Sequence, residues 1–181
     1  MALTDAGLDI WSETRNIAII ASTVYGCLDT DERYYDTVLP EEGRLASPSL
    51  FAYTLPNAFL GEAAIHFGLS GASYVINESS HSGLFGLSFA INSIKMGEHE
   101  AIIVGICDYG PPPIFSMTNR SFPGALFFVL QNGKPGKQHL SYGKLTQDKK
   151  KKLFLNGEEI VDLDTLAVMC TKVRGIPKRA V

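Results

Sequence analysis

The sequence predicts a layered α/β fold with a mostly parallel, mixed sheet, and two observations support this prediction. Continuously apolar runs of strand length alternate with longer segments of helical periodicity. Strands that are apolar on both faces are typical of a parallel sheet that helices cover on each side. In addition, the segment from Gly83 to Met96 is apolar on most of its faces, so we expect a buried helix there.

The first hundred residues contain the clearest alternation of strands and helices. The run IAIIASTV is short, apolar and rich in β-branched residues, as expected of a buried strand. A later segment, NAFLGEAAIHF, has its apolar residues at helical spacing and is followed by Gly68. The elements expected in this part are a short helix over 4–12, a buried strand over 17–24, a loop or irregular helix over 28–43, a helix over 57–67, a strand over 73–76 and the buried helix over 83–96.

The remaining residues begin with further strands and then change in character. The elements expected are a buried strand over 101–107, a strand over 124–131, a strand over 139–146 that pairs beside it, and a helix over 163–173. Asn156-Gly157 lies between two short runs and indicates a hairpin. The run Asp148–Lys152 is charged and is interpreted as a solvated linker. We therefore divide the chain into a domain of residues 1–147 and a charged linker with a C-terminal extension, residues 148–181.

Composition and charge argue against several classes of protein. With 181 residues, 45% of them hydrophobic and 19% charged, the chain has the composition of an ordinary globular domain rather than of a disordered segment. The net charge is −3 and the first 140 residues hold no basic stripe, so we do not expect a nucleic-acid partner. No apolar run approaches the ~20 residues of a membrane span, and we expect no secretory signal.

The three cysteines, Cys27, Cys107 and Cys170, stand alone in the sequence. They form no CxxC pair and no spacing typical of a metal site. An odd number of isolated cysteines is typical of reduced thiols in a cytoplasmic protein, which is the localisation we expect. The histidines also lack a ligand spacing such as HxxxH, so we expect neither a metal nor another cofactor.

A set of short sequence words occurs in a fixed order along the chain. They are ASPSLF at 46–51, LPNA at 55–58, GEAAI at 61–65, FGLSG at 67–71, AIIVGICD at 101–108 and GALFFVL at 124–130. In this order and spacing they resemble the N-terminal half of β-ketoacyl synthases, of the thiolase superfamily, over residues 1–147. The ASPxLF and PNAxxGE words look closest to ketosynthase-like and chain-length-factor-like proteins of fatty-acid and polyketide clusters. The resemblance implies a layered, thiolase-like half-fold.

The stretch Ser80-His81-Ser82-Gly83-Leu84 matches the family word Cys-Ser-Ser-Ser/Gly-Leu, in which the catalytic cysteine opens the buried helix. Ser80 stands at the position of that cysteine, and none of the three cysteines does. The family also takes two histidines, or a histidine and an asparagine, from a second half that we do not expect this chain to supply. The resemblance therefore implies a pseudoenzyme of the family, which does not catalyse condensation.

Whether Ser80 is itself a nucleophile depends on a general base, because a serine does not ionise usefully alone. His81 is adjacent, but neighbouring residues at a helix start point in different directions. Glu78 is the other candidate base, and alternation along the strand points it away from its neighbours. We expect instead that Ser79, Ser80 or Ser82 caps the helix, an interaction worth ~1 kcal/mol. A nucleophilic Ser80 remains the alternative.

The resemblance predicts a non-condensing subunit of fatty-acid or polyketide acyl-chain assembly. It implies binding of an acyl chain, an acyl carrier protein or a partner ketosynthase. The candidates for lining an acyl pocket are Phe51, Asn57, Ser82 and Phe85. Two alternatives stay open: a serine-dependent acyltransferase or thioester hydrolase that uses Ser80, and a structural homodimer without a ligand.

The strand before the turn is the expected dimer contact. In the resembled family this strand lies at the sheet edge and pairs antiparallel with its copy across a two-fold axis. An apolar edge strand without proline or lysine is an aggregation hazard unless another chain covers it. We therefore expect a homodimer, or a heterodimer with a ketosynthase, built on Ser73, Tyr74, Val75, Ile76 and Asn77.

Overall fold

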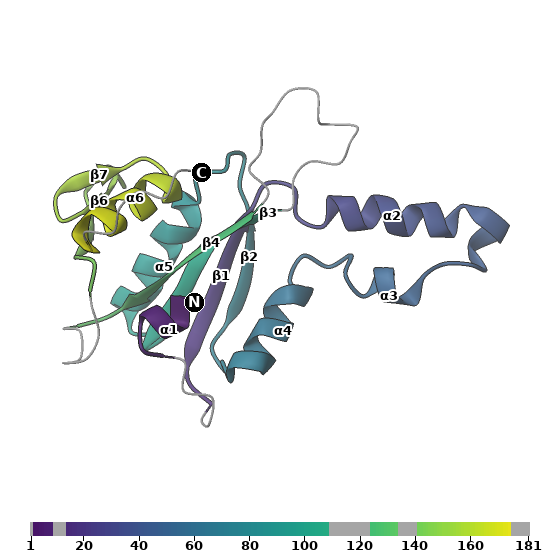
Figure 1. Ribbon diagram of the computed structural model, residues 1–181, viewed down its shortest axis with the longest axis horizontal. Coiled ribbons are helices and arrows are strands. Elements are labelled where there is room, and N and C mark those ends of the chain that lie inside the picture. The colour runs from purple at the N-terminus through teal and green to yellow at the C-terminus, as the bar shows by residue number, and fades with distance from the viewer. Residues whose placement is uncertain (1, 9–13, 109–123, 134–140, 175–181) are drawn as a thin grey trace.

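The computed structural model describes residues 2–8, 14–108, 124–133 and 141–174 (Figure 1). Its main sheet has four strands in the order β2-β1-β3-β4. They are β1 (Ile17–Thr23), β2 (Ser73–Asn77), β3 (Ala101–Asp108) and β4 (Gly124–Gln131). β1 pairs in parallel with both β2 and β3, and β4 pairs antiparallel with β3. The predicted mostly parallel, mixed sheet is confirmed.

Most of the helices follow the predicted positions, although no helix was predicted over 48–51. They are α1 (Ala2–Asp5), α2 (Leu28–Val38), the 3₁₀ helix η1 (Pro40–Gly43), α3 (Pro48–Phe51), α4 (Ala58–Phe67), α5 (Leu84–Met96) and α6 (Leu163–Arg174). The opening helix is shorter than predicted, and residues 9–12 lie outside the described ranges. The stretch 28–43, predicted as a loop or irregular helix, is the regular helix α2 followed by η1. α2 and α3 project away from the sheet (Figure 1), and neither contains a buried residue.

Alternate residues of β1 face two different helical layers, so every residue of this strand is buried. On one face, Ile20 belongs to a hydrophobic cluster with Leu87 of α5. On the other face, Ile19 belongs to a second cluster with Leu60 of α4. The apolar run of β1 is therefore continuous because helices cover both faces of the sheet, as the sequence predicted.

α5 begins and ends at glycines and is buried on part of its circumference. Gly83 before it and Gly97 after it have φ angles of +66° and +74°, which glycine adopts without strain. Its buried residues include Leu87 and Ile91, which belong to the same hydrophobic cluster as Ile20 of the main sheet. Phe85, by contrast, is 65% exposed. The predicted burial is therefore found on the packed sides of α5 but not all round it.

The C-terminal part of the chain forms a second sheet, in the order β5-β6-β7, followed by α6. Its antiparallel strands are β5 (Leu145–Gln147), β6 (Leu153–Leu155) and β7 (Glu158–Ile160). Asn156 and Gly157 join β6 to β7 with φ angles of +54° and +92°, which confirms the predicted hairpin. The pairing predicted for 139–146 is wrong, because β5 pairs with β6 and not with β4; residues 139–140 lie outside the described ranges. The boundary predicted between 147 and 148 falls in the turn from β5 to β6.

We call residues 141–174 the tail, and its apolar residues join the core around α5. In Figure 1, α5 lies between the main sheet and the tail. Leu163 of α6 is only 1% exposed, and its N–H donates a hydrogen bond to the Ser82 carbonyl at 2.9 Å. A Cβ atom on Gly83 would lie 2.4 Å from the Leu163 side chain, so the glycine leaves the space that Leu163 fills. No helix in the described ranges has the length and apolarity needed to cross a membrane.

Candidate functional site

The turn between β2 and α5 lies at the carboxyl ends of the parallel strands. Because β1, β2 and β3 run in the same direction, the residues that follow them meet at one edge of the sheet (Figure 1). In open α/β sheets this edge is where ligands bind. Two clusters of polar side chains lie there beside a small cavity: the Glu78 group, which is Glu78 with Ser22 and Ser82, and the Asp108 group, which is Asp108 with Thr23 and His81.

Glu78 holds the turn to the sheet and to the start of α5. One carboxylate oxygen, Oε1, accepts a hydrogen bond from the Ser22 hydroxyl at 2.5 Å and another from the Gly86 N–H at 3.1 Å. The other, Oε2, accepts from the Ser82 hydroxyl at 3.3 Å. A Cβ atom on Gly86 would lie 2.4 Å from Ser22 Oγ, so α5 approaches β1 closely at this point. Glu78 thus satisfies an amide in the first turn of α5.

The predicted serine cap is wrong, because the N-cap residue of α5 is Gly83 and no side chain makes the cap hydrogen bond. Ser82 Oγ accepts from the Leu84 N–H at 3.4 Å, a long hydrogen bond, while Glu78 provides the shorter contact to the helix. Sequence reasoning considered Glu78 only as a base for Ser80. Glu78 follows the last residue of a strand, where successive side chains point to opposite faces of the sheet. This alternation was the signal that the Glu78 side chain points toward the helix.

Ser80, predicted to stand at the position of the family cysteine, is exposed, and its hydroxyl bonds to no imidazole in the described ranges. Its hydroxyl donates to Ser82 Oγ at 3.3 Å, and that hydroxyl donates in turn to Glu78. The two hydroxyls therefore form a chain that ends on a carboxylate. His81, the base next to Ser80 in the sequence, faces Asp108 instead.

Asp108 ends β3 as a buried carboxylate with several donors around it. Its side chain is only 2% exposed. Oδ1 accepts from the Thr23 hydroxyl at 2.5 Å and from the Tyr25 N–H at 3.1 Å, and Oδ2 accepts from the Val24 N–H at 3.0 Å. His81 Nε2 lies 3.4 Å from Oδ2. Sequence reasoning did not single out Asp108, although an acid at the end of an apolar strand was a usable signal.

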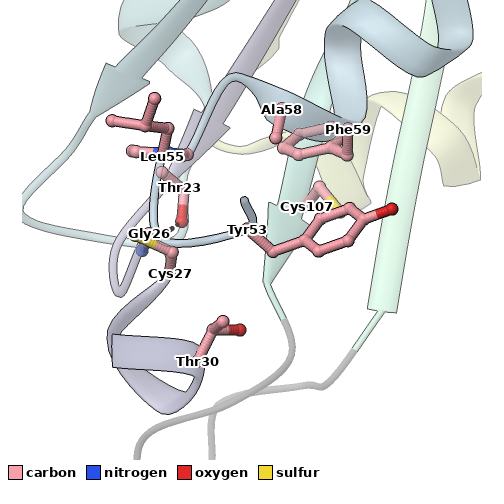
Figure 2. A pocket seen from close by; sticks show the side chains of 10 residues that line it. Thr23, Gly26, Cys27, Thr30, Tyr53, Leu55, Ala58, Phe59 and Cys107 are labelled. Atoms are coloured by element: carbon pink, nitrogen blue, oxygen red, sulfur yellow. Dashed lines mark hydrogen bonds between the residues drawn. The ribbon is translucent and has the colours of Figure 1, made fainter. Parts of the chain in front are cut away.

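A cavity of about 170 Å³ opens beside the Asp108 group, between the end of β1, the start of α2, the loop before α4, and β3 (Figure 2). Its lining residues are Thr23, Gly26, Cys27, Thr30, Tyr53, Leu55, Pro56, Ala58, Phe59 and Cys107.

The predicted acyl-pocket residues lie apart from one another and do not line this cavity. Phe51 is 60% exposed and its ring contacts that of Tyr34 at 5.4 Å. Asn57 is exposed at the start of α4, Phe85 is exposed on α5, and Ser82 belongs to the Glu78 group. Their part in an acyl pocket stays a prediction.

Two thiols line the cavity, and both hold their protons tightly. Burial raises the pKa of Cys27 to about 11, with further contributions from the hydrogen bond to Asp31 and from its negative charge. The Cys27 thiol also donates to the Thr54 carbonyl. Burial, and then the charge of Asp108, raise the pKa of Cys107. Because the thiolate is the nucleophile, these raised pKa values lower the reactivity of both thiols at neutral pH.

No three His, Cys, Asp or Glu side chains in the described ranges come together in a way that could hold a metal ion. The chemically distinct parts are an exposed serine on a sharp turn, a buried carboxylate facing a histidine, and a small cavity beside them.

The order of strands, the turn and the helix after it define an N-terminal half of the thiolase-like ketosynthase type. The sequence model of the β-ketoacyl synthase N-terminal domain matches residues 1–114. The chain belongs to the β-ketoacyl synthase family.

Several curated relatives are similar to this chain over part of their length. The 3-oxoacyl-[acyl-carrier-protein] synthase 2 of Vibrio harveyi is 27% identical over 144 residues, which are 79% of this chain and 34% of the relative. The putative polyketide β-ketoacyl synthase 1 of Streptomyces virginiae is 26% identical over 165 residues, 72% of this chain and 39% of the relative. This chain thus spans little more than a third of the length of these relatives.

Solved structures of ketosynthases with their partners share the fold. The ishigamide ketosynthase/chain length factor has a TM-score of 0.56 and 18% identity, covering 65% of this chain and 30% of that chain. The ketosynthase ApeO in complex with its chain length factor ApeC, from Xenorhabdus doucetiae, has a TM-score of 0.55 and 19% identity. The match covers 66% of this chain and 50% of that chain. The type II complex AntDE:AntF, a ketosynthase with its acyl carrier protein, has a TM-score of 0.52 and 19% identity. The match covers 63% of this chain and 29% of that chain. The predicted thiolase-like architecture is confirmed.

Proposed function

We propose that this chain is a non-condensing subunit of fatty-acid or polyketide assembly that pairs with a ketosynthase. One observation carries the proposal: the predicted position of the family cysteine holds Ser80, whose hydroxyl bonds to Ser82 at 3.3 Å and to no imidazole among the described residues. Condensation requires a nucleophile that accepts an acyl group from a thioester, and a serine without a base supplies it poorly. The raised pKa values of the Cys27 and Cys107 thiols support the same conclusion.

The free edge of β2 supports pairing with another chain. β2 is the end strand of the main sheet, so one side of it has no strand partner among the described residues. Tyr74 is 43% exposed on this edge and meets the half-exposed ring of Phe89 at 5.3 Å. A second chain that adds its strand here would continue the sheet and cover both rings. The partner is a second copy or a ketosynthase, as in the complexes of its structural neighbours.

The cavity supports contact with part of an acyl chain. A cavity of about 150 Å³ lined by apolar side chains holds a molecule the size of benzene, and the volume here is about 170 Å³. Leu55, Pro56 and Phe59 supply apolar lining. A few carbons of an acyl chain fit in this space, and a longer chain would extend into the partner.

The test is co-purification of the tagged chain with a 3-oxoacyl synthase and an acyl carrier protein from the same host. We expect a stable complex with the synthase, and no condensation product when the chain alone is given acyl and malonyl carrier thioesters. Val75→Pro removes a strand donor and adds a steric block, so it should abolish the complex or leave the protein insoluble. Val75→Thr keeps the N–H and the branched shape, and should retain it. A folded wild type that binds neither protein would overturn the proposal.

A second candidate, a serine-dependent acyltransferase or thioester hydrolase, rests on the hydrogen-bond chain from Ser80 through Ser82 to Glu78. These two hydrogen bonds offer a route for the Ser80 proton to Glu78. However, the Glu78 carboxylate already accepts hydrogen bonds from the Ser22 hydroxyl and the Gly86 N–H, so part of its acceptor capacity is in use. A structural homodimer without a ligand is the remaining alternative, and the co-purification test distinguishes it.

A further inference from the structure

His81 and Asp108 form a pair at the carboxyl edge of the sheet that the proposed function does not use. The Asp108 carboxylate is fixed from the β1 side by the Thr23 hydroxyl and by two backbone amides. The carboxylate oxygen Oδ2 accepts one hydrogen bond, from the Val24 N–H at 3.0 Å. The same oxygen lies 3.4 Å from His81 Nε2. A carboxylate oxygen accepts more than one hydrogen bond, so Oδ2 has capacity left for an N–H of the imidazole.

The two ring nitrogens of His81 have different surroundings. Nε2 is buried and has no hydrogen-bond partner at normal length, so the Asp108 carboxylate is the acceptor within reach. The side chain as a whole is 32% exposed, and no described residue hydrogen-bonds to Nδ1. The Tyr25 ring lies against the imidazole at 5.5 Å and limits its rotation.

This arrangement fixes the tautomer of the neutral ring. An imidazole that directs one N–H at a carboxylate carries its lone pair on the other nitrogen. The N–H therefore belongs on Nε2 and the lone pair on Nδ1. A closer approach of a few tenths of an ångström would bring Nε2 into ordinary hydrogen-bond range, as often happens when a substrate binds.

We propose that His81 and Asp108 are a general-base pair that activates water for the hydrolysis of short-chain acyl thioesters. Nδ1 takes a proton from water as the water oxygen attacks the thioester carbonyl carbon. The tetrahedral intermediate collapses, the C–S bond breaks with its electron pair on sulfur, and the imidazolium returns the proton to the sulfur. The products are a carboxylic acid and a thiol, and Asp108 stabilises the imidazolium that forms between the two steps.

Thr23 connects this pair to the cavity and to the size of the substrate. Its hydroxyl donates to Asp108, and the same residue lines the cavity of about 170 Å³. A short acyl group in the cavity would lie next to the carboxylate end of the pair. Ser80 is not required, because its hydroxyl is directed to Ser82 and away from His81. This activity goes beyond the proposed function, which requires no chemistry from this chain.

The test follows the release of thiol from butyryl-CoA by the purified full chain, compared with a solution without protein. We expect release above that background, and a loss of at least about 100-fold in His81→Ala, the usual contribution of a general base. Added imidazole should restore part of the rate in His81→Ala, which a merely structural histidine would not allow. His66→Ala, at an exposed histidine of α4, and Ser80→Ala should both retain the wild-type rate.

Three results would overturn the proposal: wild-type release equal to the background, a folded His81→Ala that keeps its rate, or a rate that Ser80→Ala abolishes. The last result would assign the hydrolysis to the serine. Unfolding of each variant in urea identifies those that have lost their structure. Complex formation with a ketosynthase is measured separately, so failure of this proposal and failure of the proposed function are distinguishable.

Discussion

Two regions of the molecule cover helix α5, and only one of them lies mostly within the residues that match the family model. The main sheet approaches α5 closely at Gly86, shares a hydrophobic cluster with Leu87 and Ile91, and lies mostly within the residues that match the β-ketoacyl synthase domain, 1–114. The tail meets α5 through residues such as Leu163 and lies wholly beyond that match. Both contribute to one hydrophobic cluster. The comparison teaches that the apolar helix of this family is covered here partly by a segment outside the matched domain.

The turn that carries Ser80 is held from both regions. On the sheet side, the Glu78 carboxylate bonds to Ser22 and to the Gly86 amide. On the tail side, the carbonyl of Ser82 accepts from the Leu163 amide at 2.9 Å. Weakening either region should therefore disturb the turn, but through different contacts, and variants can separate the two.

The largest effect is expected from Leu163→Ala. The side chain is 1% exposed and fills the space over Gly83. Its truncation leaves a cavity, and we expect the free energy of unfolding to fall by about 3 kcal/mol, as for other buried leucines. The measurement is equilibrium unfolding in urea. Val161→Ala, at a tail residue that is 59% exposed, should change stability by less than about 0.5 kcal/mol. Equal stability of Leu163→Ala and wild type would mean that the tail does not pack on α5.

The second prediction compares one thiol from each region. Burial raises the pKa of Cys27 and of Cys170 from 9.0 to about 11, with Asp31 adding to the first and Asp5 to the second. At pH 8 each should therefore react with iodoacetamide about 100-fold more slowly than an unperturbed thiol, and the rate should climb as the pH rises toward 11. Mass spectrometry of the two peptides gives both rates.

The same measurement in Leu163→Ala sharpens the comparison. Opening of the tail exposes Cys170 but not Cys27, so only Cys170 should become faster. Protein unfolded in guanidinium provides the reference rate for both thiols. Parallel acceleration of the two would instead indicate that the regions unfold together.

A smaller effect is expected from Glu78→Gln on the sheet side. Glutamine keeps the size of the side chain and one carbonyl acceptor, but loses the charge that strengthens the bonds from Ser22, Ser82 and Gly86. We expect a loss of about 1–2 kcal/mol in the free energy of unfolding. Glu32→Gln on the exposed side of α2 is the matched control and should have no measurable effect. An unchanged stability for Glu78→Gln would show that the turn is held by the tail alone.

Local patterns in the sequence predicted the strands and the buried helix but not how the regions assemble. Apolar runs mark β1 and β3 because helices cover both faces of the sheet, and Asn156-Gly157 marks a hairpin because both residues adopt positive φ. Nothing local indicated that Leu163 packs on Gly83, since packing joins residues 80 positions apart through shape. For the same reason the sequence did not pair His81 with Asp108.

The smallest expected effect is at Ser80 itself, where we predict no covalent adduct. The turn is held on the sheet side by Glu78 and on the tail side by Leu163, and neither region directs an imidazole at the Ser80 hydroxyl. Without a strong base the serine keeps its proton. Incubation with a serine-reactive phosphonate or with butyryl-CoA should therefore add no mass to a peptide containing residues 78–84. A stoichiometric adduct that is absent in Ser80→Ala would instead show that the hydrogen-bond chain through Ser82 to Glu78 activates the serine.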